Sequence, residues 1–231
     1  MGQLQYTVCA NGRLKLFGDC GMQTVDDNGF IQLWPTTMLH RQIANSDAAN
    51  KALIAHIMQT ESSRDDMTVD YLSENLFSVS DPVVDWLKAC VNKSVFDYLK
   101  QHAIDYEVDW QLQAWANVNR NGDYHNLHNH PYCYLSGTYY VQVPQQYNTD
   151  GRSDLNPGAI SFYDPRPQAN MGAIKGDGQI DPEYRVLPVP GLMLLWPSFL
   201  HHMVHPNLSD ELRISVSFNV ILNRKDSYLP I

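Results

Sequence analysis

Two long stretches of the chain alternate strictly between apolar and mostly polar residues, a pattern typical of β-strands with one buried face. In VDWQLQAWANVN, residues 108–119, and in LRISVSFNVIL, residues 212–222, every second residue is apolar. Successive side chains of a strand point to opposite faces, so each stretch would present one apolar and one mostly polar face. The two stretches therefore predict a sheet that packs a core on one side.

Shorter apolar runs predict four further strands between these two. They are LSGTYYVQV (135–143), AISFY (159–163), roughly YRVLPV (184–189) and LMLLW (192–196). The turn-forming clusters DPRP, GDGQ and VPG lie between them. Two polar loops, residues 147–156 and 168–181, are expected at one rim of the sheets, where long loops often cover a site.

Two helices are predicted before the strands. Ser46 is the expected N-cap of the first, which ends near Glu61. In the second, Asp81 can act as the cap, Pro82 takes the first helical position and the apolar stripe ends near His102. Helices followed by a run of strands indicate a mainly β fold of the α+β kind, an antiparallel sandwich or barrel with helices packed on one side.

The length of 231 residues fits one large domain. We therefore predict a single domain over residues 1–231. Residues 1–106 would supply N-terminal strands and supporting helices, and residues 107–223 a β-barrel core. Residues 1–45 contain short strand and turn material but no motif that we can interpret.

Charge and cysteine content narrow the classes of partner and compartment. The net charge is −9 and the chain has no basic run, so no nucleic-acid partner is expected. The four cysteines, Cys9, Cys20, Cys90 and Cys133, form no CxxC pair, which indicates free thiols in a reducing compartment. The start resembles no signal peptide and no apolar run could span a bilayer, so we expect a soluble cytoplasmic protein without a membrane partner. A homodimer is compatible with the sequence, which contains no motif that sets the oligomeric state.

Histidines gather in two segments. In NLHNHPYCYLSGTYYV, residues 126–141, His128 and His130 lie two positions apart, so extended backbone would point both imidazoles to one side. His125 would point elsewhere. A third ligand has to come from another segment, and PSFLHHMVHP offers His201, His202 and His205. An isolated pair of this kind is more often a surface turn than a metal site.

One arginine favours a metal site over a surface turn. Arg213 lies on the polar side of the last predicted strand, where its neighbours on that side are Ser215, Ser217 and Asn219. A buried arginine is costly unless it meets an anion. A guanidinium beside the Ser215 hydroxyl suits a carboxylate, which favours a metal site with a nearby anion site.

These residues together resemble the iron(II)- and 2-oxoglutarate-dependent dioxygenases, most closely the prolyl-hydroxylase-like branch and its uncharacterised oxygenases. The likeness spans about residues 108–222 and rests on NRNGDYHNLHNHPYCYLSGTYYV and PGLMLLWPSFLHHMVHPNLSDELRISVSF. It implies a double-stranded β-helix, a jelly-roll or cupin-like barrel, with iron(II) as cofactor and 2-oxoglutarate as co-substrate. It also implies an enzyme that uses O2 to hydroxylate a peptide side chain or small molecule while 2-oxoglutarate becomes succinate.

The resemblance also assigns roles to residues. His128 matches the start of the family's H-x-D/E motif, and His202 matches the distal histidine of a stretch resembling P-S-x-L-x-H-x-V-x-P. Arg213 would hold the distal carboxylate of 2-oxoglutarate with help from Ser215. In the pair Tyr139-Tyr140, the first tyrosine would also reach this carboxylate.

One position departs from the family pattern. His130 stands where the family usually has Asp or Glu, so the expected metal ligands, also the expected catalytic residues together with Arg213, are His128, His130 and His202. Three neutral imidazoles leave the full divalent charge on the metal, a ligand set that also suits thiol dioxygenases and zinc. Asp123 is an alternative source of a carboxylate.

The substrate side is predicted from strand parity and from proximity to the histidine motif. The candidates are Trp115, Asn117, Asn119 and Tyr124, with Asn119 also a candidate for cofactor binding. The rival interpretation is a cupin-like metal- or sugar-binding barrel without oxygenase activity. That reading explains the strands and histidines but gives Arg213 and Ser215 no task.

Overall fold

The computed structural model describes residues 6–8, 14–16, 28–29, 33–61, 75–104, 106–166, 174, 177, 181–223 and 225. Contacts divide the chain into two compact units, Met1–Thr37 and Met38–Ile231. In the first unit, β1 (Tyr6–Val8) and β2 (Leu14–Leu16) form an antiparallel pair. All other elements belong to the second unit. The single domain over the whole chain stays a prediction, and most of the predicted loop 168–181, like Cys9 and Cys20, lies outside the described residues.

The two predicted helices are present with nearly the expected ends. They are α1 (Asp47–Glu61) and α2 (Pro82–Gln101), and a 3-10 helix, η1 (Leu76–Ser78), lies between them. The Asp81 side chain accepts a hydrogen bond from the backbone N–H of Val83 at 2.8 Å, which caps α2 as predicted. No helix within the described ranges is long and apolar enough to cross a membrane.

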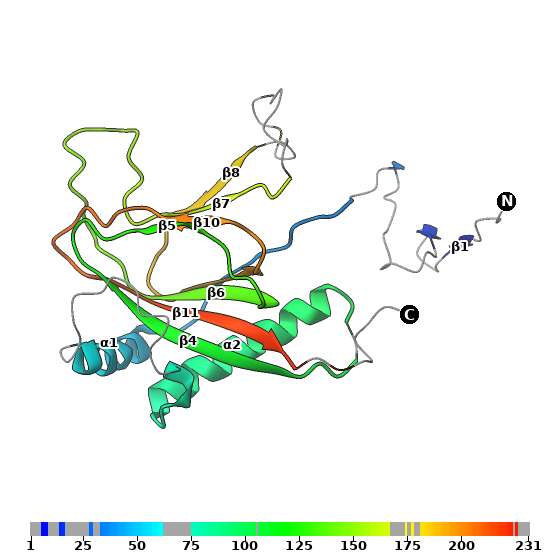
Figure 1. Cartoon of the computed structure of the whole chain (residues 1–231), viewed down its shortest axis with the longest axis horizontal. Coiled ribbons are helices and arrows are strands. Elements are labelled where there is room, and N and C mark those ends of the chain that lie inside the picture. Colours follow the sequence, from blue (N-terminus) through cyan, green and yellow to red (C-terminus); the bar gives the residue numbers. More distant parts are fainter. Residues whose placement is uncertain are drawn as a thin grey trace. The chain divides into compact units, whose positions relative to one another are not determined.

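The larger sheet has five antiparallel strands. Their order is β3 (Leu39–Gln42), β9 (Leu192–Pro197), β6 (Leu135–Gln142), β11 (Arg213–Leu222) and β4 (Trp110–Asn119). Helices α1 and α2 cover one face of this sheet (Figure 1). The apolar series of β4 and β11 packs against them, with Val118 and Val216 among the residues of this core. The face assignment made from the alternating pattern is therefore confirmed.

The smaller sheet has four antiparallel strands and faces the uncovered side of the larger one. Their order is β5 (His125–His128), β10 (His202–Val204), β7 (Ile160–Tyr163) and β8 (Glu183–Val186). A second apolar cluster joins the sheets, with Phe162 from β7 and Trp196 from β9 in contact at a ring-centroid distance of 4.9 Å. The mainly β, double-stranded β-helix fold with supporting helices is confirmed. In the described pairings the sheets stay separate and do not close into one barrel.

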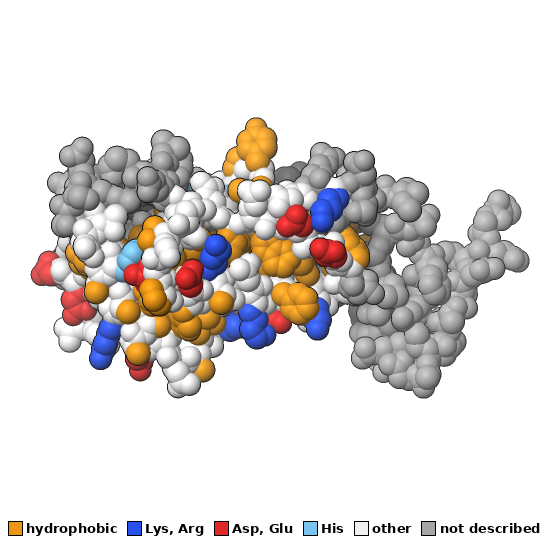
Figure 2. Space-filling view, turned by 90° about the horizontal axis from the view of Figure 1, so that it is seen from below, with side chains coloured by type: hydrophobic (Ala, Val, Ile, Leu, Met, Phe, Trp, Pro, Cys, Tyr) orange, Lys and Arg blue, Asp and Glu red, His pale blue; other side chains and the backbone are white. Residues whose placement is uncertain are grey.

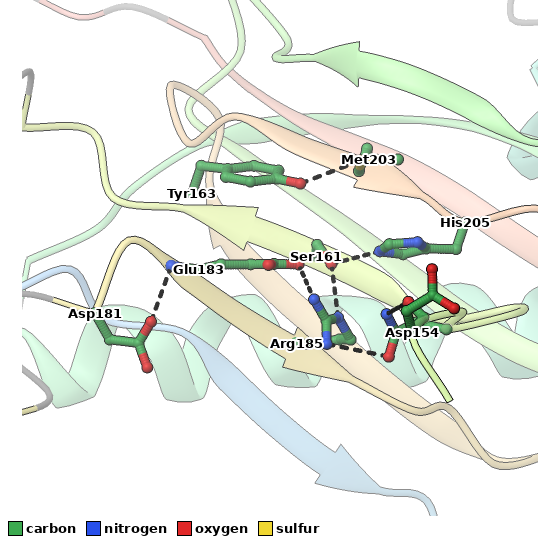
Figure 3. Close-up of polar contacts among 9 residues, drawn as sticks. Asp154, Ser161, Tyr163, Asp181, Glu183, Arg185, Met203 and His205 are labelled. Carbon is green, nitrogen blue, oxygen red and sulfur yellow. Dashed lines mark hydrogen bonds and ion pairs between the residues drawn. The ribbon is translucent and has the colours of Figure 1, made fainter. Parts of the chain in front are cut away.

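The outer face of the smaller sheet carries a network of polar contacts (Figure 3). The Ser161 hydroxyl and His205 Nε2 lie 2.7 Å apart, and Arg185 donates to Glu183 at 2.6 Å. Arg185 also donates to Asn156 and Ser161, so it bridges strands β8 and β7 and the loop before β7. His205 is therefore part of a surface network on the face that points away from the larger sheet.

The helix-covered side of the molecule is seen in Figure 2, where apolar side chains are exposed among scattered acidic and basic ones. Phe96 of α2 is 49% exposed, and Lys100 Nζ lies 4.9 Å from the centre of its ring. The described cysteines, Cys90 and Cys133, are free thiols, as expected.

Gly137 in the middle of β6 is a point of close approach. A Cβ atom at this position would meet the ring of Phe218 and the carbonyl oxygen of Leu194. We expect Gly137→Ala to lower the free energy of unfolding by about 1–3 kcal/mol, because the core has no room for the added methyl group. Chemical denaturation measures this loss. Adding Phe218→Leu should restore part of the stability, and a Gly137→Ala protein as stable as the wild type would contradict the packing described here.

Candidate metal and co-substrate site

Three histidines from the smaller sheet and its continuation meet at one point. His128 ends β5, His130 follows two residues later, and His202 begins β10, directly opposite His128 in the strand pairing. Each offers a ring nitrogen, and these nitrogens all lie within 4.8 Å of one another. In the part of the chain that the structure describes, this is the one group of histidine, cysteine and acidic side chains close enough to share a metal ion. His125, His201 and His205 do not belong to it.

Two of these imidazoles are held in the orientation that a metal needs. His128 Nδ1 lies 2.6 Å from the carbonyl oxygen of Asn126, and His202 Nδ1 lies 3.0 Å from that of Leu200. A carbonyl oxygen only accepts hydrogen bonds, so each Nδ1 carries the proton and each Nε2 keeps its lone pair. The backbone N–H of His130 donates to the carbonyl of Ser198 at 3.0 Å, which ties the third histidine to the segment before β10.

Burial keeps His130 and His202 in the deprotonated form. Together with a smaller contribution from the neighbouring His128, it lowers the pKa of His130 to about 4 and that of His202 to about 3. Both imidazoles are therefore neutral near pH 7, with a lone pair available for a metal. Three neutral nitrogen donors fit a borderline divalent ion such as iron(II).

Asp123 does not supply a carboxylate to this group. Its Oδ2 accepts a hydrogen bond from the backbone N–H of Arg120 at 2.7 Å, within the turn between β4 and β5. This contact stabilises the turn instead, and Asp123 is absent from both the histidine group and the pocket wall. The structure thus brings together the three-histidine set and not the alternative with Asp123.

The histidines open into a pocket of about 1000 Å³ between the two sheets. Its wall includes the polar side of β11, from Arg213 through Ser215, Ser217 and Asn219 to Ile221. Trp115 and Tyr124, two predicted substrate-side residues, also line it. The volume leaves room for a small co-substrate and part of a second molecule.

Arg213 lies deep in this pocket wall and is 1% exposed. Its Nε donates to the carbonyl of Gly158 at 3.2 Å, and its NH1 donates to Asn119 Oδ1 at 3.0 Å. No carboxylate of the described residues lies within ion-pair distance of it. Burial lowers the pKa of Arg213, but a guanidinium keeps its charge in proteins. A buried cation with only neutral partners is chemically suited to bind an anion.

Tyr140 lies beside Arg213 in the pocket wall. Its ring centre lies 5.1 Å from Arg213 Cζ, and its buried hydroxyl has no hydrogen-bond partner in the described structure. Burial raises the pKa of Tyr140 to about 12, although the Arg213 charge opposes this, so the hydroxyl keeps its proton and can donate. An unpaired buried donor beside a buried guanidinium suits a carboxylate oxygen.

The structure contradicts the predicted position of Tyr139. Tyr139 lies on the opposite face of β6, where its hydroxyl donates to Asn50 Oδ1 at 2.7 Å and its ring meets Trp86 edge-on. It belongs to the core beneath the helices and does not line the pocket. Because neighbouring residues of a strand point to opposite faces, Tyr140 and not Tyr139 faces Arg213.

Asn119 and Asn117 also have other roles than predicted. Asn119 does not line the pocket but accepts from Arg213 through Oδ1, while its Nδ2 lies 3.2 Å from His125 Nε2. It therefore holds the Arg213 guanidinium in position without itself facing the pocket. Asn117 Nδ2 donates to the Ser217 hydroxyl at 2.9 Å and approaches Ser215 at 3.4 Å, so it holds the serines of the pocket wall.

Three residues line the pocket although the sequence analysis did not place them there: Tyr140, His125 and Trp196. The indole ring centre of Trp196 lies 4.9 Å from the ring centre of His202. Trp196 also belongs to the apolar cluster between the sheets. The side-by-side tyrosines were a signal for Tyr140, but nothing in the sequence selected the second over the first.

The comparisons with known proteins give one family match and several similar folds. Residues 113–219 match the family model described as "Putative 2OG-Fe(II) oxygenase", a range that includes all three histidines and Arg213. No curated protein matches the sequence. Among solved structures, a prolyl-4-hydroxylase from Pseudomonas putida is 13% identical, with 82% of this chain and 94% of that chain covered and a TM-score of 0.56.

Two further solved structures are similar in fold. A prolyl hydroxylase from Trichoplax adhaerens, in complex with a hypoxia inducible factor peptide fragment, is 12% identical over 80% of this chain and 83% of its own, with a TM-score of 0.54. The non-heme alpha ketoglutarate dependent epimerase SnoN of nogalamycin biosynthesis is 13% identical over 80% and 76%, with a TM-score of 0.56. At these identities the likeness is one of fold.

The two-sheet fold and the matched segment define the class of protein. Residues 113–219 match the family of the 2OG-Fe(II) oxygenases, as the sequence resemblance predicted, and the fold is shared with solved members of that class. The match and the fold together indicate an enzyme of this class, with iron(II) as cofactor and 2-oxoglutarate as co-substrate.

Proposed function

We propose that the protein is a hydroxylase in which His128, His130 and His202 hold iron(II) and Arg213 binds the distal carboxylate of 2-oxoglutarate. The observation that carries this proposal is the buried Arg213, which lacks an acidic partner among the described residues and lines the same pocket as the histidines. A metal-binding barrel without oxygen chemistry would have no use for this guanidinium.

The residues divide the task between binding and orientation. The Nδ1 hydrogen bonds of His128 and His202 fix the orientation of both rings before the metal binds, so the side chains lose little rotational freedom on binding. Arg213 and the Tyr140 hydroxyl would together bind one carboxylate, and Asn119 keeps the guanidinium in place. Iron(II), when bound, supplies the oxygen chemistry that couples decarboxylation of 2-oxoglutarate to oxidation of the substrate.

Water exclusion is the second contribution of the protein. The apolar cluster between the sheets, with Phe162 and Trp196 beside His202, shields one side of the histidine group. Trp115, whose ring centre lies 6.0 Å from that of His130, and Tyr124 form part of the wall near the metal ligands. These two aromatic residues are the proposed contacts for the primary substrate, a peptide side chain or a small molecule.

The substrate and the outcome at its C–H bond need direct measurement, since both prolyl hydroxylases and an epimerase share this fold. The test is oxygen-dependent formation of succinate from 2-oxoglutarate by the iron(II)-loaded protein, followed over panels of peptides and metabolites. A hydroxylase should give succinate and a product heavier by one oxygen atom in equal amounts. Formation of succinate in an amount equal to the substrate converted, but with a product of unchanged mass, would exclude hydroxylation.

A matched pair of tyrosine variants tests the corrected anion position. Tyr140→Phe is expected to weaken 2-oxoglutarate binding by about 10-fold, because it removes one hydrogen bond to a charged group. Tyr139→Phe should leave this affinity unchanged and lower the free energy of unfolding by about 1 kcal/mol, because Asn50 loses its buried donor. Calorimetric titration and chemical denaturation measure the two quantities. The assignment fails if Tyr139→Phe is the variant with weaker 2-oxoglutarate binding.

A further inference from the structure

The pocket wall contains positive charge but no negative charge. Its lining residues include the cation Arg213, whereas none of them is an aspartate or a glutamate. The tyrosine that faces Arg213 does not compensate the charge, because burial raises the pKa of Tyr140 to about 12 and leaves the phenol neutral near pH 7. Within the described lining, the protein itself supplies no anion.

The ligand set adds to this imbalance. Three neutral imidazoles leave the full charge on a divalent ion, whereas a carboxylate ligand would remove one unit of it. A divalent ion and Arg213 together carry three positive charges, of which the dianion 2-oxoglutarate neutralises two. One positive charge then remains in a pocket with apolar walls from Ile160, Trp196 and Val204, where an uncompensated charge is costly.

A second observation points in the same direction. The indole nitrogen of Trp196 is buried and has no hydrogen-bond partner in the described structure, although Trp196 lines the pocket next to His202. An indole N–H can only donate, so it needs an acceptor. A buried donor without an acceptor costs free energy that a bound acceptor would recover.

We propose that the pocket binds a further monoanion together with 2-oxoglutarate, beside His202 and Trp196, and that the primary substrate supplies it as an acidic group. The inference rests on the proposed function, because it assumes both the metal and 2-oxoglutarate. It excludes amines as primary substrates, because a cation here would meet like charge and no carboxylate in the described wall.

Azide is the probe, and the full chain loaded with cobalt(II) gives the readout, because the visible spectrum of cobalt(II) reports its ligands without turnover. Cobalt(II) and 2-oxoglutarate are added first, and each should change the spectrum. If neither binds, the proposed function fails. If both bind, azide at millimolar concentrations should cause a further, saturable change while 2-oxoglutarate stays bound, as followed by its NMR signals. No further change, or displacement of 2-oxoglutarate by azide, overturns the inference alone.

Three variants test the stated cause. His130→Asp removes one unit of positive charge and should raise the azide dissociation constant at least ~10-fold with metal still bound. Asn219→Asp places a charge on the pocket wall without changing a ligand and should raise it several-fold. Trp196→Phe removes the donor while keeping an aromatic ring and should also weaken azide binding. Equal azide affinity in wild type, His130→Asp and Asn219→Asp would overturn the charge argument.

Discussion

Arg213→Ala is expected to weaken 2-oxoglutarate binding at least ~30-fold, equivalent to about 2 kcal/mol, while iron(II) binding changes little. The guanidinium is buried with neutral hydrogen-bond partners, so in the free protein its charge is uncompensated, and the carboxylate of the co-substrate would be its counter-ion. Calorimetric titration of the metal-loaded protein with 2-oxoglutarate measures the loss, and a separate metal titration gives the control. Unchanged affinity for 2-oxoglutarate would show that Arg213 does not hold the co-substrate.

Arg213→Met separates this role from a structural one. Methionine fills much of the same volume without the charge, and replacing a buried unpaired charge by an apolar group is often neutral or stabilising. We therefore expect the metal-free Arg213→Met protein to be at least as stable as the wild type and yet to bind 2-oxoglutarate as weakly as Arg213→Ala. If Arg213 served only the fold, Arg213→Met would lose stability.

His202→Ala is expected to lower the affinity for iron(II) more than ~100-fold, because loss of a direct ligand exceeds the effect of losing an outer partner of a ligand. His201→Ala is the matched control. His201 is the adjacent residue, is exposed and lies outside the histidine group, so its removal should leave metal binding unchanged. Metal competition with a coloured chelator measures both variants, and circular dichroism checks that they fold. Equal losses in the two variants would contradict the assignment of His202.

How much of the fold could be predicted depended on how each strand is buried. Strands β4 and β11 have one apolar and one polar face, and so their orientation follows directly from the sequence. Strand β6 is central in its sheet and buried on both faces, with only Gln142 less than fully covered. Its sequence therefore lacks the alternation that would show which of Tyr139 and Tyr140 faces the pocket.

Site residues followed the same rule. The two-residue spacing of His128 and His130 predicted that their side chains point to the same side. For His202, only the family resemblance selected this histidine over its neighbours His201 and His205. Asn119 was placed on the correct side of β4, but its role depends on lying directly opposite Arg213 in the strand pairing. This register is a tertiary property, so parity alone led to a cofactor contact instead of a positioning residue.

Short strands were the other limit. Strand β3 has four residues that alternate only between partly buried and exposed, and it comes from a segment without an interpretable motif. It joins the sheet as an edge strand next to β9, and its Arg41 pairs with Asp97 of α2 at 2.8 Å. Such contacts come from the helix and strand meeting in three dimensions, which no local pattern records.

The central claim is that iron(II) and 2-oxoglutarate meet in one pocket, between the three histidines and Arg213. Anaerobic titration of the iron(II)-loaded wild-type protein with 2-oxoglutarate tests it most directly, because a keto acid bound to iron(II) through two oxygens gives a weak visible charge-transfer band. We expect this band to appear and saturate in the wild type and in His201→Ala, and to be absent in His202→Ala. An iron(II)-loaded wild-type protein that shows no band at saturating 2-oxoglutarate would contradict the claim and leave a metal-binding barrel without oxygenase chemistry.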